Sequence, residues 1–258
     1  MATTPVTQYA TDRNLRARQR LWERQEPAFD VVDWTLELAG VTPGLRVLDV
    51  GCGNGRYLAV MRSRGVDAVG CDTSVGMLLG SPGGRVIAAD AVALPFPAGR
   101  FDVVLAPHML YHVADRATAV LEFRRVLTPA GRCVAVTNGR RHLASLRAVV
   151  QDAVAFFQPG WRWVDTVSDA FSLENGGDQL SVAFDDVRCV RPDEPGRAIV
   201  TDPEVVAGYL ASVGDIYGRD LTRSWDRLVQ DVRARVAAVI ERDGAFVVEG
   251  DVGAFVCQ

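Results

Sequence analysis

A glycine-rich turn offers the strongest sign of ligand chemistry in this 258-residue chain. Glycines at positions 51, 53 and 55 would let the backbone approach a ligand closely, and a following helix would offer free N–H groups. Dinucleotide-binding enzymes use the same device, but the third glycine of their G-x-G-x-x-G motif would fall at Arg56. Asp49 stands just before the turn, where a carboxylate would repel a pyrophosphate but attract a cationic group. The turn therefore favours a cofactor that carries an ammonium and a sulfonium.

Two further carboxylates follow the next apolar segments. Asp72 comes about twenty residues after the turn, where an acidic side chain can accept both hydroxyls of a ribose. Asp90 ends the third segment, where it could accept from an adenine amino group. Either aspartate alone is also typical of a helix N-cap. The set in this order predicts a nucleoside-binding site at the carboxyl ends of parallel strands.

The elements that must position these residues alternate between two kinds. Short segments that are apolar throughout predict strands at 45–50, 66–71, 85–89, 101–106 and 131–137. Helical periodicity appears between them at 55–64, 75–79 and 116–127. Strands without polar alternation, separated by helices, indicate a parallel sheet that is covered on both faces. The sequence thus predicts a doubly wound α/β fold.

The flanking regions are expected to be more irregular. Helices are predicted at 14–23, 28–39, 141–157 and 221–241, and another begins at Asp202-Pro203. Strands are predicted at 183–190 and 198–201, and a C-terminal hairpin joins 245–249 to 252–257. We expect residues 1–40 to form a helical arm over the site. Residues 41–258 would form a single domain, in which 191–243 are a helical insertion between the sixth and seventh strands.

Four segments together resemble the successive motifs of class I S-adenosylmethionine-dependent methyltransferases. They are Leu48–Gly55, Cys71-Asp72, Asp90–Phe96 and Phe101–Val104. The similarity extends over residues 45–138. It implies a Rossmann-like sheet with strand order 3-2-1-4-5-7-6, in which strand 7 is antiparallel, and S-adenosylmethionine as cofactor, which becomes S-adenosylhomocysteine.

The resemblance also implies roles for matching residues. Asp49 and Gly51 would lie near the methionine amino group of the cofactor, and Asp72 would bind its ribose. Asp90, with the amide of Ala91 or Val92, would bind adenine. Further cofactor contacts are implied at Cys52, Gly53, Thr73, Met77, Ala106 (through its carbonyl), Tyr9 and Arg18. Relatives fold such an N-terminal arm over the cofactor, where an arginine could hold the methionine carboxylate and Tyr9 could shield the sulfonium.

Two of the three histidines follow the fourth strand, where relatives line the methyl-acceptor pocket. His112 or His108 could act as a general base, because an unperturbed imidazole titrates near neutrality. Both are equally suited to filling space and fixing the loop. Pro107 stands where many relatives have an asparagine, so contacts of that amide do not transfer to this chain. His142 is a weaker candidate, at the surface or facing the substrate.

The second half of the chain would determine what is methylated. Its aromatic residues could wall an acceptor pocket or pack in the core: Phe156, Phe157, Trp161, Trp163 and Phe171. We expect a methyl group to be transferred to oxygen, nitrogen or carbon of a small molecule in natural-product biosynthesis. The alternatives are a methyltransferase acting on RNA or protein, a NAD-dependent oxidoreductase, and a protein that binds the cofactor without transferring its methyl group.

The composition of the chain limits the kinds of partner that we expect. The net charge of −4 disfavours a nucleic-acid partner, which requires a concentrated basic face. No apolar run approaches the roughly 20 residues of a membrane helix, and the first 21 residues lack the apolar core of a secretory signal. The five cysteines are scattered, so no metal site is expected. We therefore predict a cytoplasmic monomer or homodimer without membrane or nucleic-acid partners.

Overall fold

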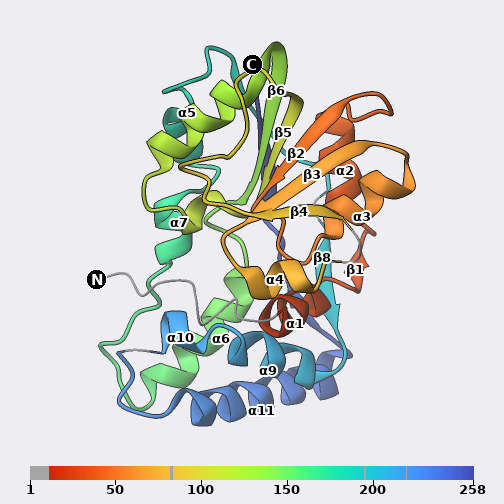
Figure 1. Ribbon diagram of the computed structural model, residues 1–258. Coiled ribbons are helices and arrows are strands. Elements are labelled where there is room, and N and C mark those ends of the chain that lie inside the picture. Colours follow the sequence, from red (N-terminus) through yellow and green to blue (C-terminus); the bar gives the residue numbers. More distant parts are fainter. Residues whose placement is uncertain (1–11, 82–83, 195, 219) are drawn as a thin grey trace.

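The computed structural model describes residues 12–81, 84–194, 196–218 and 220–258, and its centre is a seven-stranded sheet (Figure 1). The strands are β2 (Arg46–Val50), β3 (Asp67–Asp72), β4 (Arg85–Ala88), β5 (Phe101–Pro107), β6 (Leu127–Asn138), β7 (Val187–Val190) and β10 (Val252–Cys257). Their order is β4-β3-β2-β5-β6-β10-β7, and β10 is antiparallel to both of its neighbours. This is the predicted 3-2-1-4-5-7-6 order, so the doubly wound α/β fold is confirmed.

Helices cover both faces of this sheet. They are α2 (Val31–Leu38) and α3 (Arg56–Ser63) on one face, and α5 (Arg116–Val126) and α8 (Gly176–Leu180) on the other. Successive residues of a strand point to opposite faces, so Val47 packs with α2 and α3 whereas Leu48 packs with α5 and α8. Because both faces are buried, the central strands must be apolar throughout. Three short helices, α4 (Val75–Leu79), η1 (Leu110–His112) and α7 (Thr166–Ala170), follow β3, β5 and α6, respectively.

A second hydrophobic core lies below the sheet in Figure 1, and we call the elements around it the cap. The cap consists of α1 (Arg13–Leu21), β1 (Gln25–Glu26), α6 (Ala144–Ala155), β8 (Arg197–Val200), α9 (Pro203–Ala211), α10 (Gly214–Tyr217), α11 (Trp225–Asp243) and β9 (Phe246–Val248). Leu21 of α1, Leu146 of α6 and Leu210 of α9 are buried together in its core. The first helix of the chain is thus packed with segments about 125 to 190 residues further along the sequence.

The predicted C-terminal hairpin is wrong. β9 pairs with β8 in a separate antiparallel sheet of order β1-β8-β9, while β10 lies between β6 and β7. The burial pattern gives the reason. Val247 of β9 is partly exposed between two buried neighbours, as suits a one-sided sheet, whereas 253–257 of β10 are buried throughout and require cover on both faces.

The segment between β7 and β10 contains β8, α9, α10, α11 and β9. The expected helical insertion at 191–243 therefore coincides with three helices but also contributes a strand to the cap sheet. The division of the chain into an arm and one domain with an insertion stays a prediction. Among the described residues, no helix has the length and apolar composition needed to cross a bilayer.

Candidate functional site

A large cavity lies between the carboxyl ends of the central strands and the cap. Its volume is about 1350 Å³, and its wall includes the loops after β2, β3, β4 and β5 together with residues of α1, α9 and α10. Ligands of open α/β sheets bind at this edge. Small-molecule sites usually occupy roughly 300–1,000 Å³, so this cavity has room for two molecules.

The glycine turn forms one end of the cavity. Gly51, Gly53 and Gly55 adopt left-handed φ angles of +69°, +54° and +77°. A Cβ atom on Gly51 would lie 2.6 Å from the Cβ of Met109, which lines the same cavity. The N–H groups of Gly51 and Cys52 both donate to the carbonyl of the residue before Asp72 (2.8 and 3.0 Å), which ties the turn to β3.

Asp72 and Asp90 lie on the cavity wall in fixed orientations. Asp72 Oδ2 accepts from the Gly53 N–H (3.0 Å) and Oδ1 from the Ser74 N–H (2.8 Å), and each oxygen keeps a further lone pair. Asp90 Oδ1 accepts from the Val92 N–H (3.1 Å). Within the described part of the chain, the N–H of Ala91 makes no hydrogen bond. The Val92 N–H is thus already used by Asp90, and the contact of either amide with adenine stays a prediction.

The other predicted contacts differ in where the structure places them. Cys52, Gly53, Thr73, Met77, Ala91 and Val92 line the cavity. Asp49 and Ala106 do not, because both are fully buried inside the sheet layer. The side chain of Ala106 packs against the α5 face, and Pro107, His108 and Met109 form the wall there, so the contact expected through the Ala106 carbonyl stays a prediction. Tyr9 lies outside the described residues.

Asp49 is a carboxylate without a partner. Among the described residues, neither of its oxygens accepts a hydrogen bond, and the side chain is fully buried. Burial, and then the charge of Asp72, raises the pKa of Asp49 to about 8. An unpaired carboxylate in such a place is costly and favours a cationic ligand or a proton.

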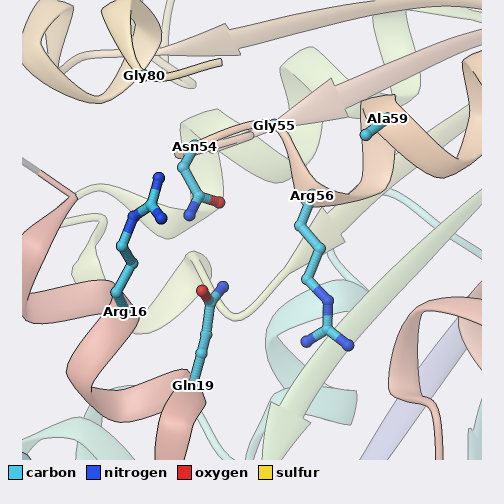
Figure 2. Close-up of a pocket in the computed structure, with 7 residues that line it drawn as sticks. All are labelled: Arg16, Gln19, Asn54, Gly55, Arg56, Ala59 and Gly80. Carbon is cyan, nitrogen blue, oxygen red and sulfur yellow. The ribbon is translucent and has the colours of Figure 1, made fainter. Parts of the chain in front are cut away.

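Helix α1 is the part of the cap that faces the glycine turn. Figure 2 shows Arg16 and Gln19 of α1 facing Asn54 of the turn across a smaller hollow of about 310 Å³, with Arg56 beside it. Arg18 lines the large cavity, and its guanidinium donates to the hydroxyl (3.2 Å) and the carbonyl (2.9 Å) of Ser212. In this structure Arg18 is therefore bound to the end of α9.

All three histidines line the cavity. His108 has a left-handed φ of +55°, which is unusual for a residue with a side chain and marks backbone strain at the site. Burial, followed by the positive charges of Arg56 on His108 and of Arg18 on His112, lowers the pKa of both imidazoles to about 4. Both rings are therefore neutral near pH 7.

Most of the aromatic wall was missed from the sequence. Among the five predicted aromatic residues, Trp163 lines the cavity, whereas Phe156 is 85% exposed and Phe171 is buried in the sheet core. Phe157 and Trp161 pack in the core of the cap. The wall also includes Trp22, Tyr209 and Tyr217, which come from α1, α9 and α10 or directly follow them, and Phe29, Tyr57 and Tyr111 line the cavity as well. The sequence signal for Trp22 and Tyr209 is their position in the helices expected at 14–23 and from Asp202 onward.

The chain is similar in sequence to characterised methyltransferases. Residues 48–135 match the family model described as a methyltransferase domain. The chain is 33% identical over 174 residues to the demethylmenaquinone methyltransferase of Beutenbergia cavernae, which covers 64% of this chain and 69% of that protein. It is 34% identical over 148 residues to the ubiquinone biosynthesis O-methyltransferase of Pseudomonas aeruginosa, which covers 51% of this chain and 63% of that protein.

The fold is also shared with solved structures. A S-adenosylmethionine-dependent methyltransferase from Archaeoglobus fulgidus superposes with a TM-score of 0.53 at 15% identity. The match covers 98% of this chain and 96% of that structure, so the cap region is included in the comparison.

Proposed function

Because the chain belongs to the class I S-adenosylmethionine-dependent methyltransferase family, we propose that it methylates an oxygen, nitrogen or carbon atom of a small aromatic molecule. The cavity is the observation that carries this proposal. One end is formed by the glycine turn and the oriented Asp72, and the other by aromatic side chains of the cap. Membership of this family argues against the alternative that the chain is a NAD-dependent oxidoreductase.

The residues at the glycine turn fit S-adenosylmethionine. The free lone pairs of Asp72 suit two ribose hydroxyls, and Asp90 with the Ala91 N–H offers the acceptor and donor that an adenine edge requires. Asp49 lies buried behind the turn and outside the cavity wall, where its unpaired charge would attract the ammonium of the cofactor. When bound, the cofactor supplies a methyl group on a positively charged sulfur.

The acceptor end favours a planar ring. The two relatives are named for demethylmenaquinone and ubiquinone biosynthesis, which involve quinone rings. At the cap end of the cavity, the rings of Trp163 and Tyr217 lie with their centroids 4.1 Å apart, next to the wall formed by Trp22 and Tyr209. Flat aromatic faces of this kind pack well against a flat ligand. A role in natural-product biosynthesis stays a prediction.

The chain's own contribution would be alignment, exclusion of water and removal of a proton. The cap closes the acceptor end, which holds the reacting groups together and limits access of water. His108 and His112 are neutral and can accept a proton from a hydroxyl as it is methylated. An acceptor amine would need little more than orientation.

Radiolabelled methyl transfer tests the proposal. The full-length enzyme should label members of a panel of hydroxynaphthoquinones, catechols and aryl amines. Total RNA and denatured protein should stay unlabelled. If RNA or protein is labelled and no aromatic compound is labelled, the proposal of a small-molecule acceptor is wrong and the enzyme acts on a macromolecule. Calorimetry should in addition show binding of S-adenosylhomocysteine and no binding of NAD.

Replacing Asp72 by alanine should weaken S-adenosylhomocysteine binding by about 1–3 kcal/mol, because charged hydrogen bonds are lost. Asp67→Ala is the matched control, since Asp67 begins the same strand at the far end from the cavity. Calorimetry on both variants measures the difference. A dissociation constant that is unchanged in Asp72→Ala would refute the ribose-binding role.

Replacing the base among the histidines should lower turnover by about 10²–10⁴-fold and leave cofactor affinity within about threefold. His108→Ala and His112→Ala should be compared across pH 6–9, using an acceptor found in the panel and S-adenosylhomocysteine as the binding probe. A variant whose activity matches the wild type at every pH shows that the histidine concerned only supports the loop.

A further inference from the structure

The turn directly after β6 fixes His142 in place. The N–H of Gly139 donates to the carbonyl of Asp251 (2.8 Å), and the N–H of Leu143 donates to the carbonyl of Glu249 (3.0 Å). Leu143 adopts a left-handed φ of +61°, a strained conformation for leucine that the surrounding contacts must hold. The turn is thus attached on both sides of His142 to the segment that leads into β10.

Two contacts also fix the ring of His142. The backbone N–H of Asp251 donates to Nδ1 at 3.3 Å. The ring stacks on Trp22, with centroids 5.1 Å apart and an interplanar angle of 23°. A neutral imidazole carries one N–H group, so with Nδ1 acting as the acceptor the proton is assigned to Nε2.

His142 is therefore a donor and not a base. Burial first, and then repulsion by His108 when that ring is protonated and by Arg147, lowers the pKa of His142 to about 3, so the ring stays neutral at physiological pH. Its Nδ1 lone pair is taken by Asp251, and its Nε2 already holds the proton. Within the described residues, no acceptor pairs with Nε2–H, although His142 lines the cavity. A donor left in this way favours a ligand oxygen.

The guanidinium of the neighbouring Arg147 is already paired. Arg147 Nη1 lies 2.8 Å from Asp165 Oδ2, and its Nη2 donates to the carbonyl of Arg140. The surfaces beside His142 on the cavity wall include the aromatic rings of Trp22 and Trp163. This end of the cavity therefore suits a planar ring with an oxygen atom that can accept a hydrogen bond.

We propose that His142 Nε2–H donates a hydrogen bond to an oxygen of the methyl acceptor, and that the acceptor is an aromatic or quinonoid ring bearing a carbonyl or ionised hydroxyl. This inference rests on the proposed function of the cavity. It gives His142 a role different from that proposed for His108 and His112: His142 stabilises negative charge on the substrate oxygen and takes up no proton. A ring without oxygen would leave the N–H of His142 unpaired.

The tautomer can be measured directly. Enzyme labelled with ¹⁵N-histidine and saturated with S-adenosylhomocysteine should show, at pH 7, a His142 ring protonated at Nε2 and unprotonated at Nδ1. His142→Gln assigns the signals by their loss. Adding 2-hydroxy-1,4-naphthoquinone as the probe should shift the Nε2–H resonance. A proton on Nδ1, a charged ring, or an unshifted resonance on saturation with the probe would overturn the proposal.

Binding of the probe tests the same donor with two variants. His142→Phe keeps a flat ring beside Trp22 but removes the donor, and should weaken binding of 2-hydroxy-1,4-naphthoquinone about tenfold, equivalent to ~1.4 kcal/mol. His142→Gln can place an amide N–H near the position of Nε2 and should bind within about threefold of the wild type. The oxygen-free ring 2-methylnaphthalene should bind equally to all three proteins.

The outcomes separate this inference from the function on which it rests. Equal binding of the quinone by the wild type and by His142→Phe would overturn the role of His142 while leaving methyl transfer intact. A wild-type enzyme that binds S-adenosylhomocysteine but neither ring would overturn the acceptor class. A wild-type enzyme that does not bind S-adenosylhomocysteine would overturn the proposed function itself.

Discussion

Binding of S-adenosylhomocysteine should release close to one proton at pH 7 and should strengthen as the pH rises from 6 to 8. Burial raises the pKa of Asp49 to about 8, so its carboxyl group is largely protonated at pH 7 before the ligand binds. The ammonium of the ligand, bound on the cavity side of the turn, would favour the ionised form through its charge, so the proton leaves on binding. Affinity should therefore rise by roughly tenfold per pH unit below pH 8, and level off above it, where the carboxylate is already ionised.

The titratable groups that face Asp49 do not change their charge between pH 6 and 8, so the released proton is expected to come from Asp49. Burial raises the pKa of the thiols of Cys52 and Cys71 and of the phenol of Tyr57, so all three stay neutral between pH 6 and 8. Asp72 is the charged group that acts on Asp49, and its repulsion adds to the effect of burial. His108 is neutral in the same pH range, because its pKa lies near 4.

Calorimetry in phosphate and in Tris, which differ in their enthalpies of ionisation, measures the released proton. Asp49→Asn should abolish the difference between the two buffers and make affinity independent of pH between 6 and 8. It should also weaken binding at pH 8 by about 10- to 100-fold, because the attraction between the buried carboxylate and the ammonium of the ligand is lost. Equal binding enthalpies of the wild type in both buffers would show that Asp49 is not linked to the cofactor.

Gly51→Ala should nearly abolish binding of S-adenosylhomocysteine. The new Cβ would lie 2.6 Å from the Cβ of Met109, so the turn or the loop after β5 must move at the wall of the cavity. Alanine is strained at the left-handed φ of +69°, and this strain should lower the free energy of unfolding by about 1–2 kcal/mol. We expect affinity to fall by at least about 100-fold, because a displacement of this size disrupts closely placed contacts.

Gly65→Ala is the matched control. Gly65 has a φ of +71°, but a Cβ there would meet nothing within 4 Å, and the residue does not line the cavity. It should lose the same ~1–2 kcal/mol of unfolding free energy, measured by urea denaturation, and keep wild-type affinity. If Gly51→Ala binds as tightly as Gly65→Ala, close approach at Gly51 is not needed by the cofactor.

The sheet and its cofactor end could be predicted because their signals are local in the sequence. Apolar runs that end in Asp49, Asp72 and Asp90 identify parallel strands and their carboxyl ends, and parallel pairing brings those ends together. Helix α4 was predicted with its observed bounds of 75–79, since short apolar periodicity and flanking turn residues define it.

The acceptor end could not be predicted in the same way, because long-range packing determines it. Nothing local in the sequence indicates that Trp22 stacks on His142, or that Asp251 selects the tautomer of that ring. The pairing of β9 with β8 was missed for the same reason: a short turn at Gly250-Asp251 favours a hairpin locally, and the burial of β10 between two strands overrides it.

The cap is built from segments that lie far apart in the sequence, and this constrains the order in which parts of the protein can fold during synthesis. Arg18 and its partner Ser212 are separated by 194 positions, and the apolar Leu21 is buried only among residues from 143 onward. Helix α1 must therefore wait, with its apolar face uncovered, until most of the chain has been synthesised. The glycine turn and the first five strands of the sheet can assemble during that interval. The cavity between the sheet and the cap consequently closes last, after the edge of the sheet that carries the glycine turn has formed.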